Sequence, residues 1–314
     1  MTPAAIAFCL AFASLAIAAA AGSLVIAAVD ALTRRAWWAP LGVRTRAGLL
    51  AQARLAPLTV TVVFTPLVQV AFWSFEPRSG SESIGIALLA LAAAGVALTT
   101  LVAVRGWRTA RATTEVARTW RNAAAPAAVR GWDGPAWVVQ TPFPVVAVVG
   151  VRRAELFVSA DVLSTCSEPE LEAVAAHERA HVAEYDNLLR MLVALTPAFG
   201  PAVGRLERVW DATMEEAADL QARAGGNGAT LARALTKVAR LAIAASDGPS
   251  LAMSAFLGRG SLEARVRRLL EPPGRPGRPL RGLSMAALPL TVVAAASGLP
   301  AIYEAAEFLV RLGR

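Results

Sequence analysis

The chain has 314 residues, of which 56% are apolar and 17% charged, and its mean hydropathy is +0.50. Soluble domains are about 45–50% apolar, so this composition excludes an ordinary soluble protein and indicates a membrane protein. The net charge of +8 lies largely in loops beside apolar segments, and we expect no direct nucleic-acid binding. Two isolated cysteines, Cys9 and Cys166, predict no disulfide framework.

Four uncharged stretches are long enough to cross a bilayer core, which requires about 20 residues. We predict transmembrane helices at residues 3–29, 55–75, 84–104 and 282–303. The first stretch lacks the basic start of a signal peptide and exceeds the roughly 7–15 apolar residues of such a peptide. We therefore interpret it as an uncleaved anchor in the plasma membrane.

The distribution of arginine predicts the orientation of these spans. The loop between the first two spans carries five arginines and one acid, whereas the next turn carries one arginine and two acids. By the positive-inside rule the first loop is cytoplasmic. We accordingly divide this multi-pass protein into three transmembrane helices (1–104), a cytoplasmic domain (105–281), and a fourth transmembrane helix with a short tail (282–314). Both termini are then outside the cell.

Within the cytoplasmic segment, residues 107–123 predict a helix that mixes basic and apolar residues. This helix either lies on the membrane surface or continues the third span. Short valine-rich runs follow at residues 136–140, 145–151 and 155–162, and they predict the strands of a small sheet. The segment is therefore expected to form an α+β domain.

The two histidines of the chain, His177 and His181, enclose Glu178 in the sequence His-Glu-Arg-Ala-His, the HExxH signature of zinc peptidases. Ser167 and Glu170 predict a capping box upstream, which places the motif inside a helix. Helical spacing brings both imidazoles to one face, where they can bind one metal ion with Glu178 as general base. The alternative is a chance pair of surface histidines, expected with this glutamate in about one chain in three thousand.

A catalytic zinc site needs a third protein ligand, and no histidine remains to supply it. A second helix is predicted at residues 205–224, where Asp211, Glu215 and Asp219 form an acidic stripe at four-residue intervals. Alone, such a stripe would be a solvated face. Beside an incomplete zinc site, we predict Glu215 as the metal ligand and Asp219 as the group that orients a ligating imidazole. Glu216 points about 100° away from Glu215 and is not chosen. The predicted packing face of this helix comprises Leu206, Trp210, Thr213, Ala217 and Leu220.

The HExxH of residues 177–181, followed by Glu-Glu-Ala-Ala-Asp at residues 215–219, resembles the gluzincin-type membrane metallopeptidases. Two branches share these motifs: BlaR/MecR-type antirepressors and HtpX-type heat-shock and CAAX-processing peptidases. Three spans, a zinc domain and a fourth span form the layout of the BlaR/MecR type, and residues 265–270 are also similar to it. Members that sense β-lactams carry a penicillin-binding domain after the fourth span, so direct β-lactam sensing is not expected here.

This resemblance implies a mostly α membrane protein with four transmembrane helices and a cytoplasmic α+β gluzincin-like zinc metallopeptidase domain between the third and fourth. It implies a zinc metalloendopeptidase with one Zn²⁺ per chain that acts in signal transduction. Its substrate would be a protein or peptide, either a BlaI-type winged-helix repressor or the enzyme itself. The alternatives are an HtpX-like quality-control protease and a non-catalytic zinc-binding signalling or scaffold protein. Such peptidases commonly bind substrate as an added strand at a sheet edge.

Overall fold

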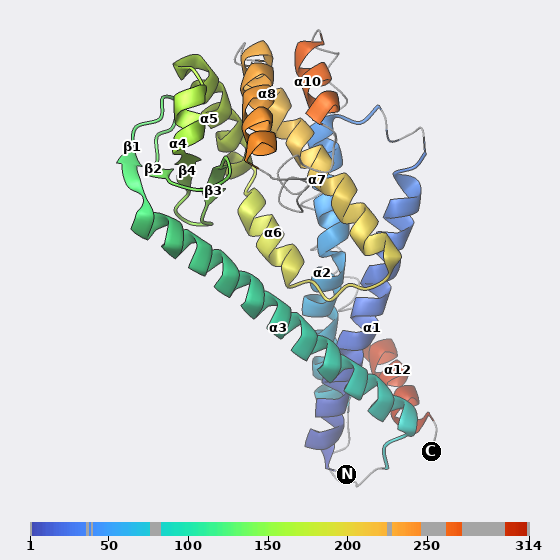
Figure 1. Ribbon diagram of the computed structural model, residues 1–314. Helices are drawn as coiled ribbons and strands as arrows, with labels where there is room; N and C mark the ends of the chain where they lie inside the picture. The colour runs from blue at the N-terminus through green and yellow to red at the C-terminus, as the bar shows by residue number, and fades with distance from the viewer. Residues whose placement is uncertain are drawn as a thin grey trace.

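Three long helices near the N-terminus are long and apolar enough to cross a membrane: α1 (Pro3–Leu32), α2 (Val43–Phe75) and α3 (Ile86–Ala123). They contain the first three predicted spans and lead to a smaller mixed domain at the other end of the molecule (Figure 1). The fourth predicted span, 282–303, lies mostly outside the described residues, and its last residues begin α12 (Leu299–Arg311). The computed structural model describes residues 2–35, 38, 40–75, 83–224, 228–245, 262–271 and 299–312.

The long helices pack closely where small residues meet. A side chain at Gly22 of α1 would overlap the backbone of Pro57 in α2, so only glycine permits this approach. Near the chain termini, α12 packs into the same bundle through Ala306 and Val310, which join a cluster with Leu10 and Phe72. The N- and C-terminal ends therefore lie together at the end of the bundle remote from the sheet (Figure 1).

Helix α3 continues without a break from the third predicted span to the sheet. No proline interrupts its 38 residues, and the segment 107–123 therefore extends the span instead of forming a separate helix. At the far end, the ring of Trp120 lies 5.6 Å from that of Phe157, a buried residue of the sheet. This contact anchors the helix to the mixed domain.

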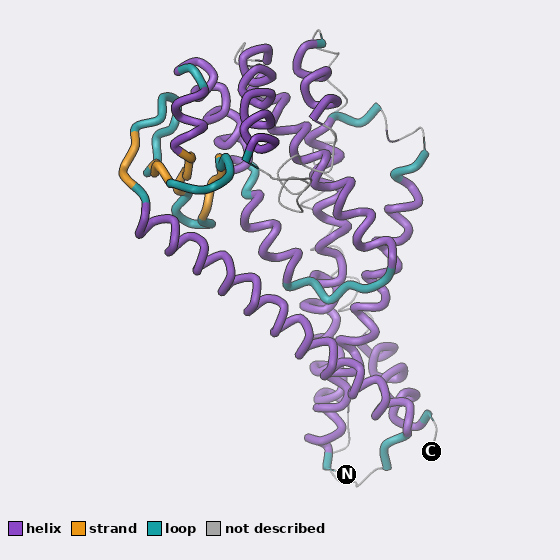
Figure 2. The backbone as a smooth tube through the Cα atoms, viewed as in Figure 1, coloured by secondary structure: helices purple, strands orange, loops and turns teal. Residues whose placement is uncertain are grey.

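The sheet has four short strands in the order β1-β2-β4-β3. The strands are orange in Figure 2. The β2–β4 pair is parallel, and the β1–β2 and β3–β4 pairs are antiparallel. Three strands fall in the predicted runs, although the third run becomes helical at Ala160, where α4 (Ala160–Thr165) begins. The bounds are β1 (Ala125–Ala127), β2 (Ala136–Val139), β3 (Val146–Val149) and β4 (Glu155–Ser159).

The remaining helices pack around the sheet and around each other. The predicted capping box begins α5, with the Ser167 backbone N–H donating to Glu170 at 2.8 Å. The motif helix ends at Ala183, because Tyr185 adopts a left-handed conformation with φ 57° and starts a new helix. The bounds are α5 (Glu168–Ala183), α6 (Asp186–Ala194), α7 (Pro201–Ala222), α8 (Gly228–Ala244) and α10 (Leu262–Leu270).

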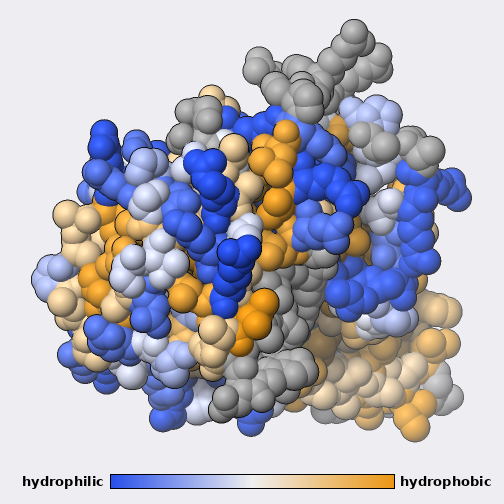
Figure 3. All heavy atoms as spheres, turned by 45° about the horizontal axis from the view of Figure 1, so that its top comes forward, coloured by the Kyte–Doolittle hydropathy of each residue, from blue (hydrophilic) through white to orange (hydrophobic). Residues whose placement is uncertain are grey.

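The membrane-length helices share a core with the mixed domain. Leu50 of α2 and Ile26 of α1 are buried in one cluster with Leu206, Trp210 and Met214 of α7. In Figure 3, hydrophilic residues cover much of the upper part of the visible face, and apolar residues dominate its lower right. The polar and apolar ends are therefore joined through α7 instead of by a flexible linker.

Candidate metal centre and active site

The two histidines of the motif meet at their Nε2 atoms. His177 and His181 lie one turn apart on α5, and their Nε2 atoms are 3.1 Å apart. His177 is 6% exposed, so the pair lies below the surface instead of on a solvated face. This arrangement places two good metal-binding nitrogens at one point.

Glu215 completes a group of three metal-binding side chains. It lies on α7, which packs against α5, and its two carboxylate oxygens are 3.6 Å from His177 Nε2 and 3.7 Å from His181 Nε2. Tetrahedral coordination with bonds of about 2.0 to 2.2 Å separates ligand atoms by about 3.3 to 3.6 Å. With one ligand atom taken from each residue, the three atoms lie within 4.8 Å of one another, so these three residues can hold a metal ion.

Glu216 does not reach this group. Its carboxylate points toward the beginning of α2, where Arg46 lies 3.0 Å away. The angle between neighbouring helical residues separates the two glutamates as expected, so one serves the metal group and the other contacts a membrane-length helix.

The Nδ1 atom of each imidazole, on the side of the ring away from the proposed metal position, faces a carboxylate. Asp219 lies 3.1 Å from His177 Nδ1, and Asp186 lies 2.5 Å from His181 Nδ1. The contact at His181 Nδ1 is a hydrogen bond, which fixes the tautomer and directs Nε2 toward a metal, whereas the contact at His177 Nδ1 lies within ion-pair distance without hydrogen-bond geometry. The sequence indicated Asp219, but it gave no reason to choose Asp186, which follows His181 by five residues across a helix break.

Arg265 of α10 pairs with two acids of α7, Glu215 and Asp219. Its guanidinium lies 2.8 Å from Glu215 and binds Asp219 through two contacts of 2.7 and 2.9 Å. Burial alone would raise the pKa of Glu215, but contacts with His177 and Arg265 outweigh burial and hold the pKa well below its usual range. Both acids therefore stay ionised, as ligands and orienting groups must be. Arg265 lies in the segment 265–270 that resembles the BlaR/MecR type, but it was not among the predicted site residues.

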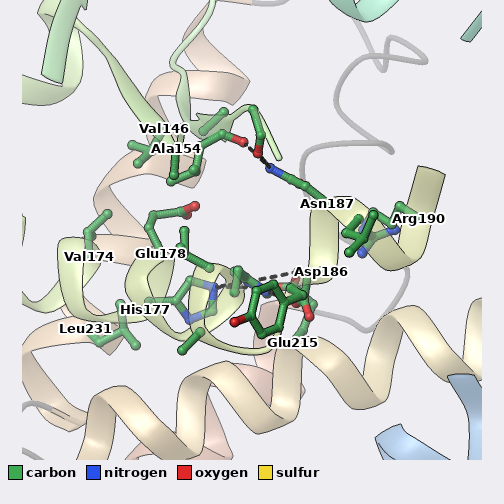
Figure 4. A pocket seen from close by; sticks show the side chains of 18 of the residues that line it. Val146, Ala154, Val174, His177, Glu178, Asp186, Asn187, Arg190, Glu215 and Leu231 are labelled. Carbon is green, nitrogen blue, oxygen red and sulfur yellow. Dashed lines mark hydrogen bonds and ion pairs between the residues drawn. The ribbon is translucent and has the colours of Figure 1, made fainter. Parts of the chain in front are cut away.

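Glu178 lies beside the metal group and faces a cavity (Figure 4). The side chain is half-buried, and burial raises its pKa although both imidazoles oppose that shift. A carboxylate with a raised pKa is a better proton acceptor near neutral pH than an exposed one. Glu178 therefore presents a carboxylate with a raised pKa to the cavity beside the histidines.

The cavity beside Glu178 has a volume of about 670 Å³. Its walls come from β3, α5, α6, α8 and α10, with valine and leucine side chains opposite the polar centre (Figure 4). Volumes of roughly 300–1,000 Å³ are typical of ligand sites. The cavity can therefore admit a segment of extended peptide next to the histidines.

Two histidines and a glutamate around one point, with a second glutamate facing a cavity, form the kind of centre used by metal-dependent peptidases. Residues 107–253 match the profile of peptidase family M48, a segment of just under half the chain. The match includes the HExxH motif, Glu215 and Asp219, and it ends before Arg265. It indicates a metallopeptidase, a hydrolase that acts on proteins or peptides. No curated protein and no solved structure matches the chain.

Proposed function

We propose that this protein is a membrane-embedded zinc metalloendopeptidase with its active site on the cytoplasmic side. The observation that carries the proposal is the convergence of His177, His181 and Glu215 beside Glu178 in a domain that matches a peptidase family. Two imidazoles and one carboxylate with a free fourth position are typical of catalytic zinc. The five arginines between the first two predicted spans and the arginines in α3 support the cytoplasmic assignment.

Different residues would bind the metal, orient its ligands and transfer the proton. His177, His181 and Glu215 would hold the ion, while Asp219 and Asp186 keep the imidazoles in place. Zinc bound there would act as a Lewis acid and lower the pKa of water toward about 7. Glu178 takes a proton from the water that attacks the peptide carbonyl and returns it to the amine nitrogen as the C–N bond breaks.

The edge of the sheet supports a mode of substrate binding. Strand β3 is the last strand in the sheet order, and its residues line the cavity next to Glu178. An extended peptide can add to such an edge through backbone hydrogen bonds and place a carbonyl near the histidines. This mode suits a protease that accepts unfolded segments of proteins.

For the physiological role, we propose signal transduction through cleavage of a BlaI-type winged-helix repressor or of the enzyme itself. The order of spans and motifs supports this role, as does the direct packing of α1 and α2 on α7. An HtpX-like quality-control protease would use the same site on misfolded membrane proteins. Incubating the enzyme with each substrate class distinguishes these roles.

Replacing Glu178 with Gln tests the catalytic proposal. The purified full chain should retain one zinc per chain, since no proposed ligand changes, while hydrolysis of an unfolded protein substrate falls by about 10²- to 10⁴-fold. Zinc is measured by elemental analysis and hydrolysis by product formation. Glu172→Gln, an exposed change on the same helix, is the matched control and should cleave normally.

Normal cleavage by Glu178→Gln would contradict the assignment of the base. A wild-type protein that binds zinc and cleaves neither repressor nor unfolded protein would instead support the scaffold alternative.

A further inference from the structure

Among the residues that the structure describes, no strand pairs with the outer edge of β3, and the backbone groups of this edge can be assigned residue by residue. Ser159 N–H donates to Val145 C=O at 2.8 Å, and directly opposed residues in an antiparallel pair alternate between bonded and non-bonded positions. Ala147 and Val149 therefore bond to β4. The backbone groups of Val146 and Val148 point the other way, toward the edge that lines the cavity.

A side chain already occupies one end of this edge. The amide of Asn187, in the first turn of α6, donates to Val148 C=O at 3.1 Å and to Gly150 C=O at 3.0 Å. Because both partners are carbonyls, the NH₂ group must face them, and each of its two hydrogens has one acceptor. Figure 4 shows Asn187 reaching from its helix to the chain beyond Val146.

The location of Asn187 ties the edge to the metal centre. Its neighbour Asp186 holds His181 at 2.5 Å, so one helical turn contacts both the proposed metal ligand and the strand edge. Tyr185, directly before them, has a positive φ of 57°, which is unfavourable for a tyrosine. The distance between the occupied carbonyls and the metal centre is therefore fixed.

We infer that Asn187 is a specificity-determining residue that ends the substrate-binding edge of β3 at Val148. This inference rests on the proposed peptidase function. An added peptide strand can form hydrogen bonds with Val146 N–H, Val146 C=O and Val148 N–H. Val148 C=O already accepts a hydrogen bond from the side-chain amide of Asn187. The enzyme then binds extended segments whose backbone turns away from β3, or ends, at Val148. The scissile bond lies at a fixed distance from Val148.

The test measures how affinity depends on peptide length. Unstructured fluorescent peptides that share one core are extended by one residue at a time at either end. Their Kd is measured by anisotropy with zinc-loaded full-length Glu178→Gln, which cannot consume them. With Asn187 present, Kd should become constant once the peptide reaches Val148. In Asn187→Ala, further residues at one end should tighten binding by about 2- to 10-fold, because freed carbonyls accept new hydrogen bonds.

Two further variants separate this role from a structural one. Asn187→Asp keeps the size of the side chain but cannot donate, so it should behave like the alanine variant. Asn122→Ala, at an exposed position on α3, should behave like the parent. An equal loss of affinity at every length, together with lost zinc, would show that Asn187 only holds α6 in place and would overturn the inference.

The inference and the proposed function fail in different ways. If the affinity of Asn187→Ala depends on peptide length but the wild type cleaves no substrate, the inference about Asn187 is supported and the proposed peptidase function is contradicted. If the wild type cleaves substrate but affinity depends on peptide length in the same way with Asn187 and with Ala at this position, only the inference about Asn187 is contradicted. Absence of binding at all lengths would also overturn it.

Discussion

Each imidazole of the metal centre is fixed at two atoms. Nε2 faces the other imidazole and Glu215, whereas Nδ1 faces an aspartate from a different helix in each case. The hydrogen bond between His181 and Asp186 restricts rotation of that ring before a metal binds, and Asp219 faces the ring of His177. A preorganised centre of this kind makes metal affinity sensitive to single carboxylates.

Glu215→Ala and Glu216→Ala form a matched pair. The first should remove bound zinc, because two imidazoles remain as the only proposed ligands, and the second should retain it, because Glu216 contacts Arg46. Zinc per chain, measured after dialysis, distinguishes them. Retention in the first variant and loss in the second would show that the wrong glutamate was chosen.

Arg265→Met should make stability depend more strongly on zinc. Removing one partner of a buried ion pair leaves uncompensated carboxylates and costs about 3 to 5 kcal/mol, and here Glu215 and Asp219 would both lose their cation. A bound zinc ion would restore positive charge, so the rise in melting temperature on adding zinc should be larger than in wild type.

Arg265→Lys serves as the control, since it keeps the charge without the bidentate contact and should give an intermediate rise. Equal rises in wild type and Arg265→Met would show that the guanidinium does not balance the metal site.

Site residues with a regular spacing could be predicted from the sequence, whereas site residues brought together only by tertiary packing could not. The motif spacing identified three residues, and the acidic stripe brought Glu215 and Asp219 to them. Arg265 lies 46 residues beyond Asp219, so their pairing depends on tertiary packing. Leu220, predicted to pack, is 48% exposed because the buried face of α7 turns away from it.

At the scale of single elements, the start of α5 predicts an effect of pH. Burial raises the pKa of Glu170, but hydrogen bonds from Lys237 and Ser167 outweigh it and lower the pKa below the ordinary 4.5. A lowered carboxyl pKa contributes stability above pH 4.5, and this stability is lost as the pH falls through the lowered value. Thermal unfolding of wild type and Glu170→Gln should therefore differ most near neutral pH and converge in acid.

Glu168→Gln is the control for this comparison, because Glu168 is exposed in the same turn. It should change stability by less than about 0.5 kcal/mol. A constant difference between wild type and Glu170→Gln at every pH would contradict the pairing with Lys237.

Helices and strands with a regular hydrophobic pattern could be predicted from the sequence, and elements without such a pattern could not. Continuous apolar stretches indicated α1 to α3, and valine-rich runs indicated three strands. Strand β1, Ala-Pro-Ala, has no alternation and is defined by its pairing with β2. The break at Tyr185 has no signal in the sequence, because a tyrosine rarely adopts a left-handed conformation.

For the whole molecule, the shared core predicts that a fragment starting at residue 105 will not fold alone. Without α1 and α2, the apolar face of α7 with Leu206, Trp210 and Met214 loses its partner. The fragment should aggregate or unfold without a cooperative transition, as measured by solubility and circular dichroism. Co-expression with residues 1–75 should restore zinc binding. A soluble fragment that binds zinc by itself would show that residues 105–281 are an autonomous domain.

The adjacent glutamates of α7 have a consequence for energetic linkage. Glu215 is a proposed metal ligand, while Glu216 binds Arg46 of a membrane-length helix, and no flexible segment separates them. If movement of α2 changes the zinc affinity by some factor, zinc must change the equilibrium of that movement by the same factor. Removing zinc with a chelator is therefore a means of perturbing the membrane helices from the opposite end of the molecule.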